Sequence, residues 1–173
     1  MAKERARDDL GGDYLTFTLD AEQYGLTIRR VMEILEYQPV TLVPGAPPSI
    51  RGVINLRGSV VPVVDLAGKF GLPSNPVTKW TCLVIVEATL GGDTTLLALV
   101  ADAVNDVLPF TAKEIAPPPS FGTRVRLDYL LGLGKLESGF VLLLDADKVL
   151  TLEELLSIAP PSPKREGAAE EAT

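Results

Sequence analysis

The sequence contains no histidine, and its 173 residues include only one cysteine, Cys82, and one tryptophan, Trp80. The absence of histidine removes the commonest general base and metal ligand, and it excludes phosphotransfer through a histidine side chain. A single cysteine excludes an internal disulfide and is typical of a protein from a reducing cytoplasm. Much familiar enzyme chemistry is therefore closed to this chain.

Basic residues and long apolar runs are also scarce. Lys and Arg number 16 against 23 Asp and Glu, which gives a net charge of −7 and a pI near 4.6. A nucleic-acid or anionic-membrane partner needs a basic face, so we expect neither. No apolar run approaches the roughly 20 residues of a membrane-spanning helix, and residues 1–13 lack the apolar stretch of a signal peptide. The sequence predicts an acidic cytoplasmic protein without direct membrane insertion.

The remaining candidates for catalysis are weak. Cys82 has no histidine to activate it, so we interpret it as a small buried apolar residue. The glycines of residues 132–139 miss the spacing of a dinucleotide site and predict a turn. Asp65 and Asp145 each precede a short helical pattern, where a carboxylate caps backbone amides. Asp93, Asp102 and Asp106 are too sparse for a calcium site. We expect no catalytic residues, no cofactor and no metal.

Between two charged tails, residues 1–13 and 158–173, the chain is dominated by alternating apolar patterns. YLTFTL places Leu15, Phe17 and Leu19 on one face, which predicts a half-buried strand. Further strands are predicted at 40–43, 52–56 and 60–64, and a hairpin is predicted where CLVIV and TLLALV flank a glycine turn. About ten short strands with glycine turns favour an all-β fold of small closed barrels.

Four helical patterns interrupt the strands. Ile28, Val31, Ile34 and Leu35 have helix spacing, and Val104, Val107 and Leu108 take the corresponding place in the second half. Asp65 fits the N-cap of a short helix that ends near Phe70. The longest predicted helix is 146–158, because its apolar residues form a stripe at helical spacing.

The two halves of the chain resemble each other. Each has a hairpin, then a short apolar segment, then a strand, a glycine-marked turn, a strand, an aspartate and a short helix. The copies are about seventy residues apart. Two copies are too few for a solenoid but suit two related β subdomains, which we place at about 14–78 and 79–157.

Three surface features are unusual for a self-contained barrel. Arg57 occupies the turn of the hairpin VINLRGSVVPVVDL, where no turn type requires an arginine. Pro62 lies within the second strand of that hairpin and predicts an edge or a bulge there. Phe121 follows three prolines, which hold it on a stiff, extended segment. From the sequence alone, Phe121 is equally well interpreted as a lid on its own core or as an exposed contact residue.

Four segments resemble successive motifs of CheW, the family of bacterial chemotaxis coupling proteins: YLTFTLDAEQYGLTIRRVMEIL, IRGVINLRGSVVPVVDL, ADAVNDVL and LGLGKLESGFVLLLD. The resemblance extends over about residues 14–157, and NLRG followed by VPVVDL is its most specific part. It implies two packed, five-stranded, SH3-like barrels. Members of this family are not enzymes. They bridge the cytoplasmic tips of chemoreceptors to the regulatory domain of the histidine kinase CheA, in arrays that can also contain further CheW copies.

The resemblance also implies site residues. For receptor binding these are Val31, Glu33, Thr41, Arg57 and Val107. For kinase binding they are Arg51, Gly52 and Phe121. The implied recognition is of a helix in a groove, where apolar contacts give affinity and charges fix the register. Ala116 departs from the pattern, because some relatives carry a basic residue there, and this puts the contact at Phe121 in doubt.

The sequence also allows other interpretations of these residues and of the function. Spacing alone places Val31 and Val107 in the core, and Glu33 and Thr41 on a solvated surface. The same module also serves chemosensory pathways without flagella, such as twitching or gliding motility. A β-barrel enzyme or ligand carrier is a third possibility. It predicts a concave apolar pocket with convergent polar groups.

Overall fold

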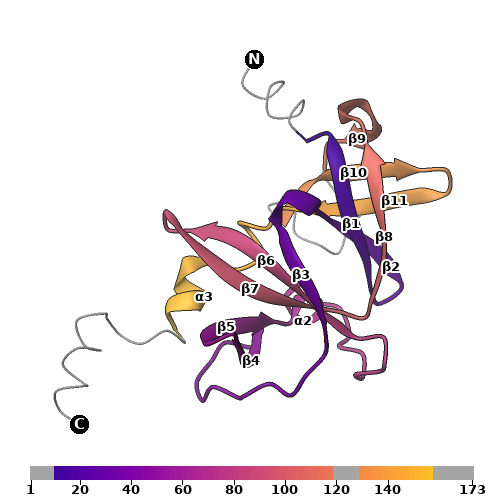
Figure 1. Ribbon diagram of the computed structural model, residues 1–173. Helices are drawn as coiled ribbons and strands as arrows, with labels where there is room; N and C mark the ends of the chain where they lie inside the picture. The colour runs from indigo at the N-terminus through magenta and orange to yellow at the C-terminus, as the bar shows by residue number, and fades with distance from the viewer. Residues whose placement is uncertain (1–9, 119–128, 158–173) are drawn as a thin grey trace, which may run out of the picture.

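Two β-sheets make up most of the computed structural model, which describes residues 10–118 and 129–157 (Figure 1). Sheet A has the order β8–β1–β2–β11–β10–β9, and sheet B has the order β3–β6–β7–β5–β4. The strands of sheet A are β1 (Gly12–Leu19), β2 (Glu22–Thr27), β8 (Ala103–Phe110), β9 (Ile115–Ala116), β10 (Leu130–Leu136) and β11 (Gly139–Leu144). Those of sheet B are β3 (Val31–Glu36), β4 (Ile50–Leu56), β5 (Ser59–Val64), β6 (Cys82–Leu90) and β7 (Asp93–Ala101). The expectation of an all-β fold is confirmed, although sheet A has six strands rather than five because it includes the two-residue strand β9.

The sheets are interleaved along the chain. Strand β3 follows the hairpin β1–β2 but pairs with β6, while β8 follows the hairpin β6–β7 but pairs with β1. Parallel pairing then joins β2 to β11 and β7 to β5. Each sheet therefore contains strands from both halves of the chain. The expected boundary between residues 78 and 79 does not coincide with the division between the sheets, because these pairings are not local.

Three apolar clusters fill the molecule. One lies inside sheet A and includes Tyr14, Phe110 and Val141, and a second lies inside sheet B and includes Ile54 and Leu83. The largest cluster takes residues from both sheets, and we call it the inter-barrel core; its members include Phe17, Tyr24, Leu26, Val84, Val86 and Leu99. Because β1 faces two of these clusters, it is buried on both sides rather than half-buried. Thr16 is 1% exposed and satisfies its hydroxyl on the backbone of Asp106.

The hairpins β4–β5 and β10–β11 are structural copies. Ile50 pairs with Val64 and Leu130 pairs with Leu144, and a bulge follows the first residue of each pair. Equivalent positions are 80 residues apart (130 − 50 = 80), rather than about seventy. Pro62 lies on β5 just before the two residues that pair with β7, so only the first part of β5 lacks a neighbour on that side.

The helical predictions need correction. Residues 28–35 form only a 3₁₀ turn, η1 (Ile28–Arg30), followed by strand β3, and residues 104–108 lie in strand β8. In the predicted helix 146–158 only α3 (Leu152–Leu156) is helical among the described residues, because the backbone of its N-cap, Thr151, is extended. The expected strand 40–43 is reduced to a single bridge between Thr41 and Val53.

Asp65 caps α2 (Leu66–Lys69) as predicted, since its carboxylate accepts the Gly68 amide at 3.1 Å. The remaining helical turn is η2 (Ala112–Glu114). With five residues, α3 is the longest of the described helices, and none of them could cross a bilayer.

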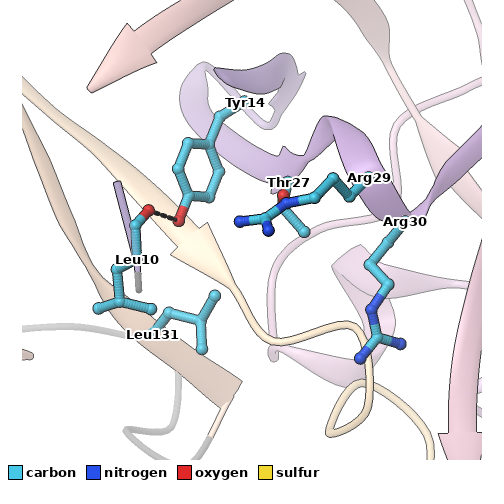
Figure 2. A pocket seen from close by; sticks show the side chains of 6 residues that line it. All are labelled: Leu10, Tyr14, Thr27, Arg29, Arg30 and Leu131. Carbon is cyan, nitrogen blue, oxygen red and sulfur yellow. Dashed lines mark hydrogen bonds between the residues drawn. The ribbon is translucent and has the colours of Figure 1, made fainter. Parts of the chain in front are cut away.

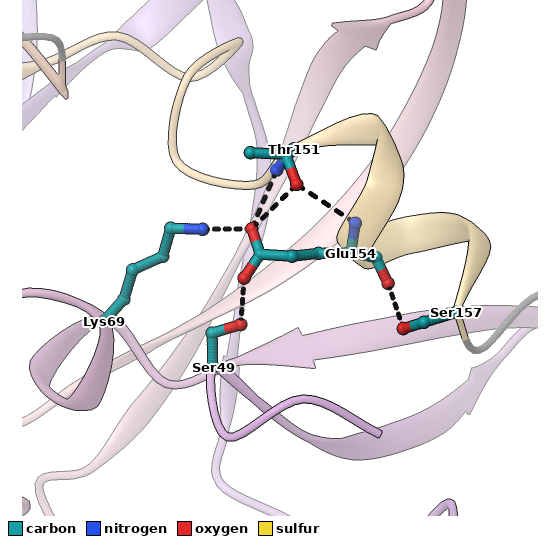
Figure 3. Close-up of polar contacts among 5 residues, drawn as sticks. All are labelled: Ser49, Lys69, Thr151, Glu154 and Ser157. Carbon is teal, nitrogen blue, oxygen red and sulfur yellow. Dashed lines mark hydrogen bonds and ion pairs between the residues drawn. The ribbon is translucent and has the colours of Figure 1, made fainter. Parts of the chain in front are cut away.

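Polar contacts attach α3 to residues from the first half of the chain (Figure 3). The Glu154 carboxylate accepts hydrogen bonds from Lys69 Nζ and Ser49 Oγ, which lie far away in the sequence. Thr151 and Glu154 also form a reciprocal capping box. Burial raises the pKa of Glu154, but the hydrogen bonds from Lys69, Ser49 and the Thr151 amide outweigh it and lower the pKa to about 2. Since no residue of α3 is fully buried, these bonds contribute much of its attachment.

Candidate protein-docking site

The tip of the hairpin β4–β5 has an unusual backbone. Arg57 and Gly58 have φ angles of 51° and 87°, the pattern of a type I′ turn, and the Asn55 side chain accepts the Gly58 amide at 2.8 Å. The left-handed region is unfavourable for a side chain as large as arginine. Arg57 is nevertheless held there with 72% of its side chain exposed. A strained, exposed residue of this kind is a candidate for a functional contact.

Glu33 holds the Arg57 side chain in place. Both guanidinium nitrogens of Arg57 bond to the Glu33 carboxylate at 2.7 Å, which is the bidentate geometry that fixes an arginine most firmly. The hydrogen bond from Arg57 lowers the pKa of Glu33 below its ordinary value. Glu33 belongs to β3 and Arg57 to the β4–β5 turn, at the two edges of sheet B. The pair therefore links the edges of sheet B, and it brings two of the predicted receptor residues together.

Arg51, one of the predicted kinase residues, has internal partners. Its Nε lies 3.5 Å from Asp65 Oδ2, its Nη1 donates to the Tyr37 hydroxyl at 3.3 Å, and its guanidinium lies 5.8 Å from the centre of the Tyr37 ring. Burial lowers the pKa of Arg51, but Tyr37 and Asp65 outweigh it and raise the pKa above its ordinary value. These contacts connect β4, which contains Arg51, to the segment that follows β3.

Gly52 has a packing role as well. Its φ is +152°, and a Cβ placed there would lie 2.1 Å from the carbonyl oxygen of Thr41. Thr41 is exposed and bonds Val53 through both backbone groups at 2.9 Å. The glycine therefore permits the bulge in β4 and the close approach of Thr41. Two more predicted site residues, Thr41 and Gly52, are in this way brought into contact.

Val31 and Val107 face the inter-barrel core from different sheets. Val31 packs against that core and pairs with its member Val86, while Val107 pairs with its member Leu15 and is 47% exposed. Residues directly opposite each other on paired strands share one face of the sheet. β3 and β8 are both edge strands, so these valines lie at the margin of the core.

Ile34 was not among the predicted site residues, but it has the same setting as Val31. It pairs with Val84 of the inter-barrel core but is 43% exposed. Helix spacing placed it in a buried stripe, whereas the alternation in VMEILE shows it on an edge strand. We call Val31, Ile34 and Val107 the inter-barrel rim. Phe121 lies outside the described residues, so the structure places seven of the eight predicted site residues.

A small pocket lies elsewhere, where Leu10, Tyr14, Thr27, Arg29, Arg30 and Leu131 surround about 230 Å³ (Figure 2). The Tyr14 hydroxyl donates to the Leu10 carbonyl at 2.5 Å, and burial raises the pKa of Tyr14. The pocket is open and smaller than the roughly 300–1,000 Å³ of a usual ligand site. Within the described ranges, no three carboxylate or thiol side chains gather to hold a metal ion. The enzyme or carrier interpretation gains nothing from these features.

Comparison with known proteins gives one consistent family. The model of the CheW-like domain matches residues 13–154. A chemotaxis protein CheW from Klebsiella aerogenes is 37% identical over 150 residues, which cover 87% of this chain and 88% of that protein. The Bacillus subtilis chemotaxis protein CheW is 31% identical over 156 residues, covering 87% and 94% of the two chains.

A solved structure agrees with these relatives. The scaffolding protein TtCheW from Thermoanaerobacter tengcongensis has a TM-score of 0.75 and 30% identity, and the match covers 83% of this chain and 90% of that one.

Proposed function

This chain belongs to the family of CheW-like domains, and on that basis we propose that it is a non-catalytic adaptor that couples chemoreceptors to the kinase CheA. Its place is the cytoplasm, at membrane-associated receptor arrays. The observation that carries the proposal is β3, an edge strand that presents two exposed apolar side chains, Met32 and Ile34, and the Glu33–Arg57 pair. Exposed apolar groups beside fixed charges are typical of a protein-docking surface.

The receptor partner is a helix bundle, the cytoplasmic tip of a chemoreceptor. In this proposal an amphipathic helix lays its apolar face on the inter-barrel rim. Thr41, which bonds Val53 of β4, is the remaining predicted receptor contact. The Glu33–Arg57 pair then fixes the position of the helix along the surface, because its two charges pair with opposite charges on the helix. Arg57 is already oriented by Glu33, so it loses little side-chain entropy on binding.

The kinase partner is the regulatory domain of CheA. Family resemblance assigns it Arg51 and Gly52, where the Arg51–Tyr37 and Gly52–Thr41 contacts give β4 a fixed shape. A second contact, which would extend the assembly into rings with CheA or other CheW copies, is assigned to Phe121. Phe121→Ala tests it: we expect little loss of stability in urea but weaker kinase binding. A loss of about 3–5 kcal/mol in stability would instead identify Phe121 as a lid on its own core.

The main experiment is assembly with both partners. The full chain is titrated with a receptor cytoplasmic fragment and with the CheA regulatory domain by calorimetry, and the ternary mixture is separated by size-exclusion chromatography. We expect each partner to bind alone and all three to co-elute. Failure of either partner to bind would overturn the proposal. Gene neighbourhood would then assign the pathway, flagellar or otherwise.

A further inference from the structure

Arg30 lies where the chain crosses from one sheet to the other. It is the last residue of η1, which connects β2 of sheet A to β3 of sheet B. Its Nη1 and Nη2 donate to the two carboxylate oxygens of Asp147 at 2.8 and 2.9 Å. Asp147 follows β11, the strand of sheet A that pairs with β2. This bidentate pair joins the crossing point to sheet A.

The same two side chains also hold sheet B. Nη1 of Arg30 donates to the Glu87 carbonyl at 3.0 Å, and Asp147 Oδ1 accepts the Thr89 amide at 2.7 Å. Glu87 and Thr89 belong to β6, which lies in sheet B next to β3. One guanidinium and one carboxylate thus connect both sheets at the point where β3 begins. We call this pair the sheet clamp.

The pKa values of both clamp side chains are shifted in the direction that favours their charged forms. The hydrogen bond to Asp147 raises the pKa of Arg30, and burial does not cancel it. Burial raises the pKa of Asp147, but the hydrogen bonds from Arg30 and the Thr89 amide outweigh it and lower the pKa. The two side chains are 34% and 29% exposed, so water screens them and their contribution to stability is modest. The main effect of the clamp is on geometry, since a bidentate arginine fixes both the distance and the relative orientation of the two groups that it joins.

Arg29 offers a matched comparison on the same turn. Its guanidinium points toward Tyr14 in the pocket, whereas that of Arg30 points away from it (Figure 2). Among residues 10–118 and 129–157, Arg29 forms no ion pair. The two arginines therefore share charge, size and location but differ in whether they join the sheets.

We propose that the sheet clamp is a positioning device for partner binding. The inter-barrel rim takes Val31 and Ile34 from sheet B and Val107 from sheet A, so its shape depends on how the sheets are placed relative to each other. The clamp fixes that placement one residue before Val31. Arg30 and Asp147 thereby act through the rim, without touching the receptor. This inference rests on the proposed function.

The test compares Arg30→Gln and Asp147→Asn with Arg29→Gln. Receptor-fragment affinity is measured by calorimetry at a temperature where circular dichroism shows every variant folded. We expect the two clamp variants to bind about three- to tenfold more weakly, and Arg29→Gln to stay within about twofold of the parent. Arg30→Lys, which keeps the charge but loses the fork, should fall between them.

A second readout separates positioning from simple stabilisation. Residual dipolar couplings of the free protein report the orientation of sheet A relative to sheet B. We expect this orientation to shift in both clamp variants and to stay unchanged in Arg29→Gln. Unchanged affinity, or weaker affinity without reorientation, would overturn the inference. If the parent itself fails to bind the receptor fragment, the proposed function fails, and the couplings still decide whether the clamp sets the sheet placement.

Discussion

The hairpins β4–β5 and β10–β11 have the same length and the same bulge, yet their tips carry opposite charges. Arg57–Gly58 forms the first turn and Glu137–Ser138 the second. After each hairpin the backbone closes in the same way: the Asp65 amide bonds the Ser49 carbonyl at 2.8 Å, and the Asp145 amide bonds the Tyr129 carbonyl at 2.9 Å. The two hairpins therefore share strand pairing, bulge and closing hydrogen bond, and they differ in the residues at the tip.

Among the described residues, the first tip has fixing contacts that the second tip lacks. Arg57 has a left-handed backbone and a bidentate partner, Glu33. In the second hairpin the positive φ falls on Gly139, after the turn, and Glu137 makes no hydrogen bond or ion pair within the described residues. A tip that is held in one orientation can contribute to specific recognition, whereas a mobile charge contributes mainly to solubility. We therefore propose that the first hairpin, rather than the second, contributes to recognition.

The bulge glycines should show the largest effect. Gly52→Ala forces a Cβ to 2.1 Å from the Thr41 carbonyl at a positive φ, so we expect a loss of about 2–4 kcal/mol. Gly132→Ala brings a Cβ to 2.6 Å from the Ala116 carbonyl without a positive φ, and about 1–3 kcal/mol should be lost. Urea unfolding measures both. Gly45→Ala, with φ +81° and open space around it, is the control for backbone strain alone. A larger loss at Gly132 would contradict the structure.

Reversing the tip charges should separate the hairpins by function. Arg57→Glu places two carboxylates side by side, so we expect receptor affinity to fall about thirtyfold while circular dichroism stays native. Glu137→Arg makes the equivalent reversal on the second hairpin and should change the affinity less than twofold. Calorimetric titration with a receptor fragment measures both. Equal effects at the two tips would remove the distinction drawn between them.

Glu154 bonds Ser49, the residue that precedes the first hairpin, and the equivalent residue before the second hairpin is Tyr129. The pKa of Glu154 is about 2, against an ordinary value of 4.5. A lowered pKa stabilises the fold above pH 4.5, and the stabilisation is lost as the pH falls toward 2. After allowing for solvent screening, we expect Glu154→Gln to cost about 1–2 kcal/mol at pH 7.

Urea unfolding of the parent and Glu154→Gln at several pH values tests this dependence. Their difference should stay constant above pH 5 and shrink on acidification. The exposed neighbour Glu153, changed to Gln, should show neither the loss nor the pH dependence. A constant difference down to pH 2 would count against the assigned pKa.

The smallest effect concerns the aspartates that end the hairpins. Asp65 accepts the Gly68 amide and the Ser74 hydroxyl and lies beside Arg51, while Asp145 accepts the Asp147 amide at 3.0 Å. We expect Asp65→Ala to cost about 1 kcal/mol and Asp145→Ala about half as much. Thermal unfolding compares the two. A greater loss at Asp145 would show that the second turn depends more on its cap than its contacts suggest.

Local signals in the sequence were enough for the hairpins, the repeat and the Asp65 cap. Each depends on residues close together in the chain, such as the Asn-x-x-Gly turn and an aspartate just before a helix. The helix assigned to residues 28–35 was wrong because V-x-x-I-L satisfies a helical period, while the strand pairing that overrides it comes from β6. Tertiary pairing decided a segment whose own pattern was ambiguous.

The candidate site was predicted less completely, because its contacts also join residues that are far apart in the sequence. Arg57 was identified by its odd position in a turn, but its partner Glu33 lies 24 residues away and no local pattern links them. Gly52 was attributed to kinase contact, and its collision distance to Thr41 shows a packing requirement that only the folded chain reveals. Ile34 was hidden by the helix assignment. Family resemblance supplied positions, and the structure supplied their partners.

The exchange of β3 and β8 between the halves also governs how the chain can fold during synthesis. When the ribosome has made residues up to Val64, sheet B has β3, β4 and β5 but lacks β6 and β7, which lie between β3 and β5. The hairpin β1–β2 likewise lacks its neighbours β8 and β11. At about 5–20 residues per second, the 80 residues from Val64 to Leu144 take about 4–16 s to appear. The edge of β2 that pairs with β11 stays unpaired for that whole interval, so the nascent chain is exposed to aggregation until its last strand has been made.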